Sequence, residues 1–206
     1  GTKRSDWGGF GNQSRLTNFT EESVNANLEL RYTFQADGAI RSQPAIAGDI
    51  AYFTAEKTSP TKYHSTRLYA IDTRTGEKKW DYYLGSSSKI LPEIGAETAD
   101  DPPPWISSPR VEGNKLVVGT LDGIVFCFDR NTGRVIWYKN VGSSIRSSPC
   151  IGDQKVFIGT ENSKLYGLDL ETGEQRWLTE LKGAVHSSPA YYKNRLYVSC
   201  YDNNLY

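Results

Sequence analysis

Histidine and cysteine are the residue types in this chain with the widest chemistry, because both bind metals and both act in catalysis. The sequence holds two histidines, His64 and His186, and three cysteines, Cys127, Cys150 and Cys200. The cysteines are scattered, so the set lacks the close ligand spacing of a zinc site. Gly-x-Ser-x-Gly, P-loop and dinucleotide-binding fingerprints are also absent from the sequence. We therefore expect no zinc site, and we interpret the cysteines as small buried hydrophobic residues.

An aspartate recurs three times in the pattern Asp-x-x-Thr-Gly-x-x-x-Trp, as Asp72, Asp129 and Asp169. An aspartate can serve as a general base. In this pattern it is also placed to accept hydrogen bonds from backbone N–H groups two or three residues on, as turn aspartates do. The glycine that follows can take the left-handed conformation that closes a hairpin. We therefore assign these aspartates to turns and expect no catalytic residue among them. The matching glycines are Gly76, Gly133 and Gly173.

The pattern ends in a large aromatic residue, Trp80, Trp137 or Trp177. Such a ring can stack on a ligand, or it can cover a neighbouring sheet while its indole N–H finds a carbonyl. The tryptophan recurs once in each copy of the pattern, which favours a structural docking role over ligand binding.

Composition and charge exclude several classes of protein. Lys plus Arg and Asp plus Glu both number 24, so the formal net charge is zero. A balanced chain has no electrostatic footprint for nucleic acid or an anionic membrane. No apolar run approaches the roughly 20 residues of a membrane helix. The sequence has no Met, even at position 1, so we expect a processed chain or a piece of a longer one.

A second phrase recurs with a period that defines the fold. It is Ser-Gln-Pro or Ser-Ser-Pro, at residues 42–44, 107–109, 147–149 and 187–189. The last three prolines are 40 residues apart. Each repeat contains short β-branched and aromatic segments separated by Gly, Asn and Asp turns, for example 155–159 and 164–169. This predicts an all-β fold, a β-propeller of four-stranded antiparallel blades.

The repeats divide the chain into a predicted N-terminal extension, 1–27, and a repeat region, 28–206. The repeat region begins with an outer strand, 28–34, in which Tyr32 takes the tryptophan position. Its remaining units are 40–80, 107–137, 147–177 and a partial one at 187–206.

These units amount to about four blades, whereas propellers with this type of repeat usually have seven or eight. The chain is half of a ring completed by a second chain, a fragment of a longer protein, or a closed four-bladed ring. We favour the first two.

The segment 70–80, Ala-Ile-Asp-Thr-Arg-Thr-Gly-Glu-Lys-Lys-Trp, resembles the tryptophan-docking motif of the pyrroloquinoline-quinone (PQQ) propellers. The second and third copies depart from it only at the first position, which is Cys127 and Gly167. The Ser-Ser-Pro phrases and Leu-Tyr-Gly-Leu-Asp at 165–169 are similar to the same family. The family contains quinoprotein dehydrogenases and also non-enzymatic members, such as the outer-membrane β-barrel assembly lipoprotein.

The resemblance implies different sites in the two branches. The dehydrogenases use PQQ, Ca²⁺, a catalytic Asp and a vicinal Cys–Cys ring. This sequence has no Cys-Cys pair, and no calcium set can be matched position by position. We therefore expect a non-catalytic scaffold with no cofactor and no metal, which binds a protein or peptide in the periplasm, the cell envelope or an extracellular assembly. A fragment of a dehydrogenase, with its site on blades outside this sequence, is the alternative.

Two insertions, around 56–66 and 85–104, interrupt the period of the first unit and are expected to lie on one face. Insertions on a rigid scaffold often carry binding, although a solvated loop is an equal alternative. Asp100 and Asp101 precede three prolines and suggest a stiff segment, not a metal site. The candidate surface residues are Lys57, Lys62, Tyr63, His64, Asp100, Asp101 and Trp105.

The residue before each Ser-x-Pro phrase is Arg41, Ile106, Arg146 or His186. Three of these four positions carry a side chain that can be cationic. They recur at one position of each blade, close to the expected axis. They therefore suggest a ring of positive potential that binds an anionic group or an acidic peptide. The alternative, ordinary solvated or hydrogen-bonded strand ends, is favoured over the ring.

Overall fold

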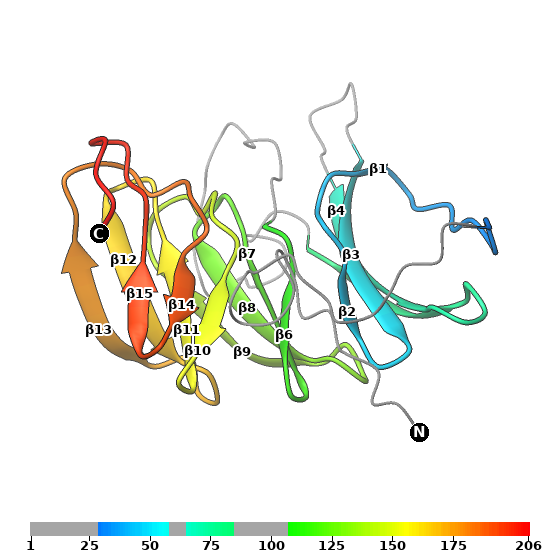
Figure 1. Cartoon of the computed structure of the whole chain (residues 1–206). Helices are drawn as coiled ribbons and strands as arrows, with labels where there is room; N and C mark the ends of the chain where they lie inside the picture. The colour runs from blue at the N-terminus through cyan, green and yellow to red at the C-terminus, as the bar shows by residue number, and fades with distance from the viewer. Residues whose placement is uncertain (1–28, 58–64, 85–106) are drawn as a thin grey trace.

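A computed structural model describes residues 29–57, 65–84 and 107–206 of the chain (Figure 1). The described residues are all-β and contain no helix long and apolar enough for a membrane span. They form antiparallel sheets of the predicted propeller type, four-stranded in the second and third blades. Turns at Gly, Asn and Asp separate the strands. Several of these residues have a positive φ, such as Gly133 at 72° and Asn194 at 60°.

The first blade contains β1 (Ala39–Ile40), β2 (Ala45–Ala47), β3 (Ile50–Lys57), β4 (Ser65–Asp72) and β5 (Lys78–Tyr83). β1 and β2 both pair with β3, so together they form an interrupted innermost strand. The second blade contains β6 (Arg110–Glu112), β7 (Lys115–Gly119), β8 (Ile124–Asp129) and β9 (Val135–Asn140), paired in sequence order.

The third blade repeats this order with β10 (Cys150–Gly152), β11 (Lys155–Gly159), β12 (Lys164–Asp169) and β13 (Gln175–Glu180). The bounds of β11 and β12 agree with those expected from the sequence. The fourth blade is partial, with β14 (Ala190–Tyr192), β15 (Arg195–Tyr197) and a bridge between Ser199 and Leu205.

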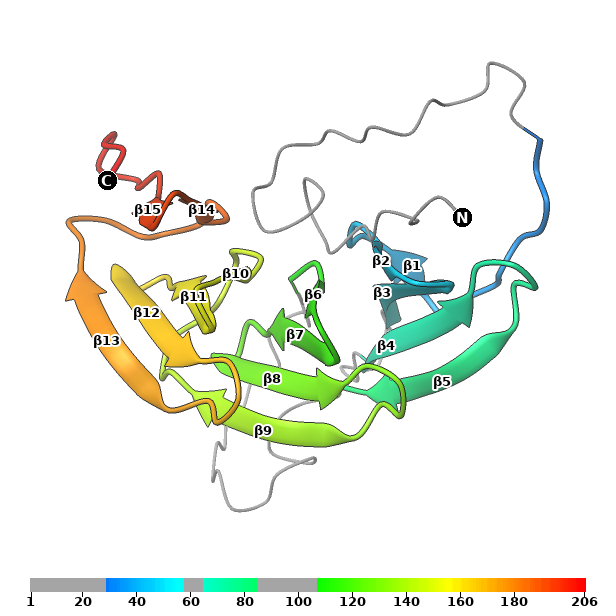
Figure 2. The same ribbon diagram turned by 60° about the horizontal axis from the view of Figure 1, so that its bottom comes forward.

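The blades stand side by side along an open arc, with β5, β9 and β13 on the outside (Figure 2). The innermost strands β2, β6, β10 and β14 contact one another in turn on the inside. The arc does not close on itself in Figure 2, because residues 29–36 and the β14–β15 hairpin lie at its two opposite ends. The described residues are therefore not a closed four-bladed ring.

Hydrophobic cores fill the spaces between blades. Tyr52, Leu68, Leu116 and Phe128 belong to the core between the first and second blades. Equivalent cores join the second blade to the third and the third to the fourth. A further cluster lies on the face of the first blade that is turned away from the second blade, and it includes Phe34 and Ala36. Burial between sheets thus binds consecutive blades, as in radial stacking.

Residues 29–38 form no strand, although an outer strand was expected at 28–34. A strand needs a hydrogen-bonding neighbour. The part of the chain that the structure describes offers no partner strand to this segment.

Each outer strand of the first three blades carries a register shift directly before its tryptophan. The pairs Ala70–Trp80 and Ile71–Lys78 leave one extra residue, Lys79, in β5. The same shift lies between Cys127 and Phe128 and between Gly167 and Leu168. Such a bulge bends a strand and re-aims the side chain beside it. This irregularity, which the sequence pattern did not reveal, positions the repeated tryptophans.

Candidate functional site

The three repeated aspartates accept hydrogen bonds within their own turns. The Asp72 carboxylate accepts the N–H of Arg74 at 2.9 Å, and Gly76 N–H donates to the Asp72 carbonyl at 2.8 Å. The Asp129 carboxylate accepts from the N–H groups of residues 131 and 132, and that of Asp169 from residues 171 and 172. These carboxylates therefore fix the turns.

The same contacts lower the pKa of the aspartates. The backbone hydrogen bond from Arg74 is the largest influence on Asp72, whose pKa falls to about 2. The side-chain hydrogen bond from Arg176 is the largest for Asp169, whose pKa also falls to about 2. A general base at neutral pH needs a pKa near 7. The shifts run in the opposite direction, so these carboxylates are poor bases.

At three places, an aromatic side chain packs on the motif turn of a blade with the same geometry. Trp80 Nε1 donates to the Arg130 carbonyl at 3.0 Å. The ring packs on Gly133, where an added Cβ would come within 2.8 Å of the nearest ring atoms. Trp137 Nε1 donates to the Leu170 carbonyl at 3.0 Å, with its ring over Gly173.

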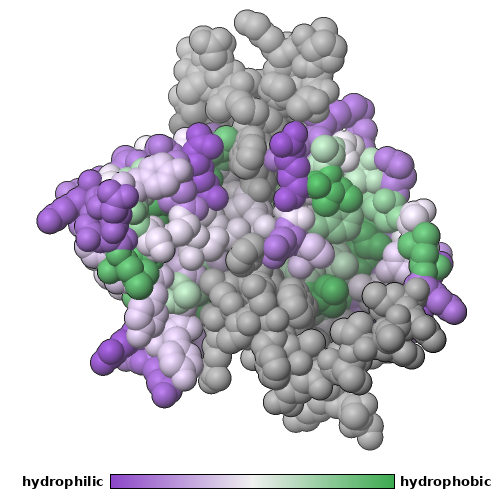
Figure 3. Space-filling view, turned by 45° about the horizontal axis from the view of Figure 1, so that its top comes forward, coloured by the Kyte–Doolittle hydropathy of each residue, from purple (hydrophilic) through white to green (hydrophobic). Residues whose placement is uncertain are grey.

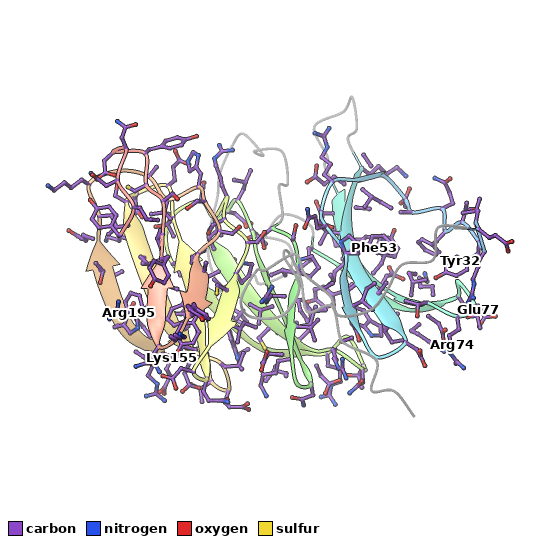
Figure 4. All side chains as sticks on the ribbon, viewed as in Figure 1. Tyr32, Phe53, Arg74, Glu77, Lys155 and Arg195 are labelled. Carbon is purple, nitrogen blue, oxygen red and sulfur yellow. The ribbon has the colours of Figure 1, made fainter. Side chains whose placement is uncertain are left out.

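Tyr32 repeats this contact with its hydroxyl, which donates to the Thr73 carbonyl at 2.9 Å while the ring lies over Gly76. Figure 4 shows Tyr32 at the same end of the arc as Arg74 and Glu77. The acceptor is in every case the residue after the motif aspartate, and the glycine is the one that closes the turn.

Trp177 lies differently. Its ring is 5.8 Å from that of Phe157, and its Nε1 would be 2.4 Å from a Cβ on Gly167. Glycine at the first motif position of the third copy is therefore required by this ring. Within residues 107–206, no following Asp-x-x-x-Gly turn is available to it.

The first serine of each Ser-x-Pro phrase binds strands within one blade. Ser147 Oγ donates to the Gly159 carbonyl at 3.0 Å and accepts its N–H at 3.2 Å. Ser42 makes the same pair of bonds with Thr54. Each serine thus satisfies a peptide group of the second strand, twelve residues on.

The second serine joins neighbouring blades. Gln43 N–H donates to Ser108 Oγ at 3.0 Å, Ser108 N–H to Ser148 Oγ at 3.1 Å, and Ser148 N–H to Ser188 Oγ at 3.0 Å. One bond crosses each of the three blade boundaries around the inside of the arc. The sequence showed the recurrence of this phrase but not its two separate functions.

The predicted cations of the inner face meet carboxylates. Arg146 Nε lies 3.0 Å from Glu161 Oε2, and His186 Nε2 lies 2.6 Å from the same oxygen. The His186 ring also contacts that of Tyr201, with centroids 4.2 Å apart. We call Arg146, Glu161, His186 and Tyr201 the axial cluster. It brings together two of the candidate residues, from the third and fourth blades.

Arg41 has an equivalent contact in the first blade, 3.6 Å from Glu56 Oε2. Glu56 and Glu161 follow their arginines by the same fifteen residues, a signal in the sequence that would have revealed both pairs. Burial raises the pKa of Glu161, but hydrogen bonds from His186 and Arg146 outweigh it, so the pKa is lowered. The carboxylates offset the positive potential of the expected ring.

One of the loop candidates lies among the described residues. Lys57 forms an exposed ion pair with Asp37 at 2.8 Å. Six other candidates lie outside the described residues, namely Lys62, Tyr63, His64, Asp100, Asp101 and Trp105. The described surface on this side is hydrophobic mainly over the first blade and more polar toward the fourth (Figure 3).

The cysteines are all buried and free, which agrees with the expectation of small hydrophobic residues. Burial raises the pKa of the Cys127 thiol to about 12 and that of Cys150 to about 11. Cys127 and Cys150 are therefore thiols at neutral pH, whereas a reactive cysteine is a thiolate. Among the described residues, no group of three or more His, Cys, Asp or Glu is placed to hold a metal ion.

Comparison with known proteins is consistent with this architecture. Residues 121–206 match the family model described as outer membrane protein assembly factor BamB. The structure is similar to that of BamB from Moraxella catarrhalis, with a TM-score of 0.54 and 23% identity over 77% of this chain and 42% of that one. It is also similar to quinohemoprotein alcohol dehydrogenase from Comamonas testosteroni, with a TM-score of 0.70 and 20% identity over 95% of this chain and 35% of that one.

The described residues have a β-propeller fold, and residues 121–206 are similar to the PQQ-like repeats of the BamB family model. Over 121 residues the chain is 29% identical to the 1-butanol dehydrogenase (quinone) of Thauera butanivorans. This match covers 57% of this chain but only 17% of the dehydrogenase. The chain therefore spans a small part of this curated relative and less than half of the BamB and quinohemoprotein dehydrogenase structures. Its described residues do not fit a Ca²⁺–PQQ site, since they bring together no set of metal-binding carboxylates.

Proposed function

We propose that the propeller is a non-catalytic scaffold that binds a protein or peptide partner in the cell envelope or in a secreted assembly. The observation that supports this proposal is that the repeated polar side chains are already used in hydrogen bonds within the propeller itself. The three motif aspartates hold turns, and the paired serines hold strands and blades. Side chains fixed in this way stabilise a rigid frame, and frames of this type bind through loops and edges.

The matched family supports the choice of partner and compartment. Its name, outer membrane protein assembly factor, describes a protein that acts with other proteins at a membrane of the cell envelope. A periplasmic or extracellular location and a protein partner follow by analogy with that name. A second chain that completes the ring belongs to the same proposal.

The axial cluster is the part of the described surface that we assign to partner binding. Arg146 and Glu161 present both signs of charge at one place, beside His186, where two blades meet. Such a mixed site favours a partner with matching charges of both signs over a simple anion.

Site-specific photo-crosslinking tests the proposal. A photo-crosslinking residue at the exposed Asn162, beside Glu161, is compared with one at the exposed Asp153, in the turn at the other end of the third blade. The two variants are expressed in separate cells and irradiated. A discrete protein adduct is expected from position 162 and not from position 153. Equal adducts from both positions, or none from either, would contradict a partner site at the axial cluster.

A dehydrogenase fragment is the second candidate, because the 29% identical relative is a quinone-linked butanol dehydrogenase. Addition of PQQ and Ca²⁺, followed by cofactor absorbance and by dye reduction with an alcohol, separates the two functions. The scaffold proposal predicts no saturable absorbance change and no dye reduction. A stoichiometric absorbance change with turnover would replace it with the dehydrogenase.

A further inference from the structure

The guanidinium of Arg146, in the axial cluster, has one occupied edge and one open edge. Its Nε donates to Glu161 Oε2 at 3.0 Å. Among the described residues, no group accepts a hydrogen bond from its Nη1 or Nη2. The Arg146 side chain is 44% exposed. The outer edge, which carries N–H donors on both Nη atoms, is therefore accessible to a ligand.

Backbone hydrogen bonds fix the residue whose carboxylate holds this arginine. Glu161 N–H donates to the Ser144 carbonyl at 2.9 Å, and Asn162 N–H donates to Ser143 Oγ at 3.1 Å. Ser143 and Ser144 belong to the segment that leads to Arg146. The turn and the arginine are therefore held to one another. An arginine that is ordered before binding loses less conformational entropy when a ligand binds.

A second basic side chain, from the fourth blade, holds the same carboxylate. His186 Nε2 lies 2.6 Å from Glu161 Oε2, so both side chains contact one oxygen. Burial acts against the ionised form of Glu161, but the hydrogen bonds from His186 and Arg146 lower its pKa. Glu161 is therefore ionised at neutral pH, where it continues to position Arg146.

Geometry and charge together select the class of ligand. Two parallel N–H groups of an arginine match the two oxygens of a carboxylate, and they also match those of a phosphate. The Glu161 carboxylate already contacts this guanidinium, and it repels a second anion in proportion to the charge of that anion. A carboxylate, with one negative charge, is therefore favoured over a phosphate group, which carries up to two.

We propose that the open edge of Arg146 binds a carboxylate of the partner protein, and that Glu161 is the positioning residue for this contact. The inference rests on the proposed function, because it names the chemistry by which the axial cluster recognises the partner. The carboxylate comes from an aspartate, a glutamate or the C-terminus of that protein.

The variant Arg146→Lys tests the contact, because lysine keeps the positive charge but lacks the two parallel N–H groups. It is introduced into the chain that carries the photo-crosslinking residue at position 162. The yield of the partner adduct should fall about tenfold, as expected for the loss of a hydrogen bond between charged groups. Arg134→Lys is the matched control, since Arg134 is an exposed arginine in the Asp129 turn, and it should leave the yield unchanged. Urea denaturation of both variants checks that they are folded.

The partner's own carboxylate provides the second measurement. Mass spectrometry of the adduct identifies the cross-linked segment of the partner, which should contain an acidic side chain or the C-terminus. In separate arms, the acidic side chain and the C-terminus are replaced by their amides. The effective replacement should lower the yield with the parent chain and cause no further loss with Arg146→Lys, because both changes then remove one contact.

The failure of this contact is distinguishable from the failure of the scaffold function. An unchanged yield with Arg146→Lys, or additive losses from the two changes, would overturn the carboxylate contact and leave the scaffold function standing. A cross-linked segment whose phosphate group is required in place of a carboxylate would do the same. The absence of any adduct from the parent chain would overturn the scaffold function itself, and the carboxylate contact with it.

Discussion

At Gly133, backbone conformation and close packing both exclude a Cβ atom. Its φ is +72°, and an added Cβ would come 2.8 Å from atoms of the Trp80 ring. The first condition alone disfavours any L side chain. The second forces the ring to move away from its carbonyl acceptor, Arg130. The glycine is therefore needed for the blade boundary as well as for the turn.

Gly133→Ala is expected to lower the free energy of unfolding by about 2–4 kcal/mol, the sum of a left-handed backbone cost and an overpacking cost. Gly113→Ala is the matched control, because Gly113 has a φ of +57° with nothing within 4 Å of the added Cβ. Its expected cost is only about 1 kcal/mol. Urea denaturation of both variants measures the difference, and equal losses would mean that the Trp80 contact adds nothing.

The motif aspartates make stability depend on acid. The pKa of Asp169 is lowered to about 2 in the folded chain, from 3.8 as its reference value. A carboxylate with a lowered pKa stabilises the fold above its unfolded pKa, and this contribution is lost as the pH falls through the folded value. The relevant range is therefore about pH 4 to pH 2.

Asp169→Asn is expected to make the pH dependence of the unfolding midpoint in this range shallower than in the parent chain but not flat, because it removes one such carboxylate while Asp72 and Asp129 keep theirs. Thermal unfolding from pH 6 to pH 2 measures the effect. Glu180→Gln, which removes an exposed carboxylate at the end of β13, should keep the full acid dependence of the parent chain. An acid limb in Asp169→Asn as steep as that of the parent would contradict the assignment.

At the scale of the strand, the Ser-x-Pro phrase stabilises the inner pair of each blade. Ser147 is fully buried and binds both the backbone N–H and the backbone carbonyl of Gly159. Ser187 makes the same two bonds with Ser199, but its site is exposed. Water can replace the hydroxyl only at the second site.

Ser147→Ala is therefore expected to cost about 1–3 kcal/mol, the range for leaving a buried polar group unsatisfied. Ser187→Ala should cost less than about 1 kcal/mol, since the freed groups are hydrated. Denaturant titrations of the two alanine variants make the comparison. A larger loss for Ser187→Ala would mean that the hydroxyl acts through something other than burial.

The strand order and turn positions were predictable because they depend on local patterns with a constant period. The bounds of β11 and β12 follow directly from alternation and turn residues. The bulge before Trp80, the serine bonds between blades and the Glu161 contacts depend on neighbours in space. A local pattern does not specify such neighbours. Residues 29–34 of the outer strand expected at 28–34 form no strand, because a strand also requires its partner.

At the scale of the whole molecule, an ion pair crosses the boundary between the second and third blades. Lys115 Nζ lies 2.6 Å from Glu171 Oε2 of the next blade. The Lys115 side chain is buried, whereas that of Glu171 is exposed.

Lys115→Glu is therefore expected to lower the free energy of unfolding by more than the roughly 0.2–1 kcal/mol that an exposed ion pair contributes, because it places a buried carboxylate against Glu171. Urea denaturation at low and high salt measures the loss, which should shrink as salt screens the like-charge contact. Lys155→Glu is the control, since Lys155 contacts Asp153 within its own turn and not another blade. Equal losses in the two variants would mean that the contact between Lys115 and Glu171 adds nothing to the blade boundary.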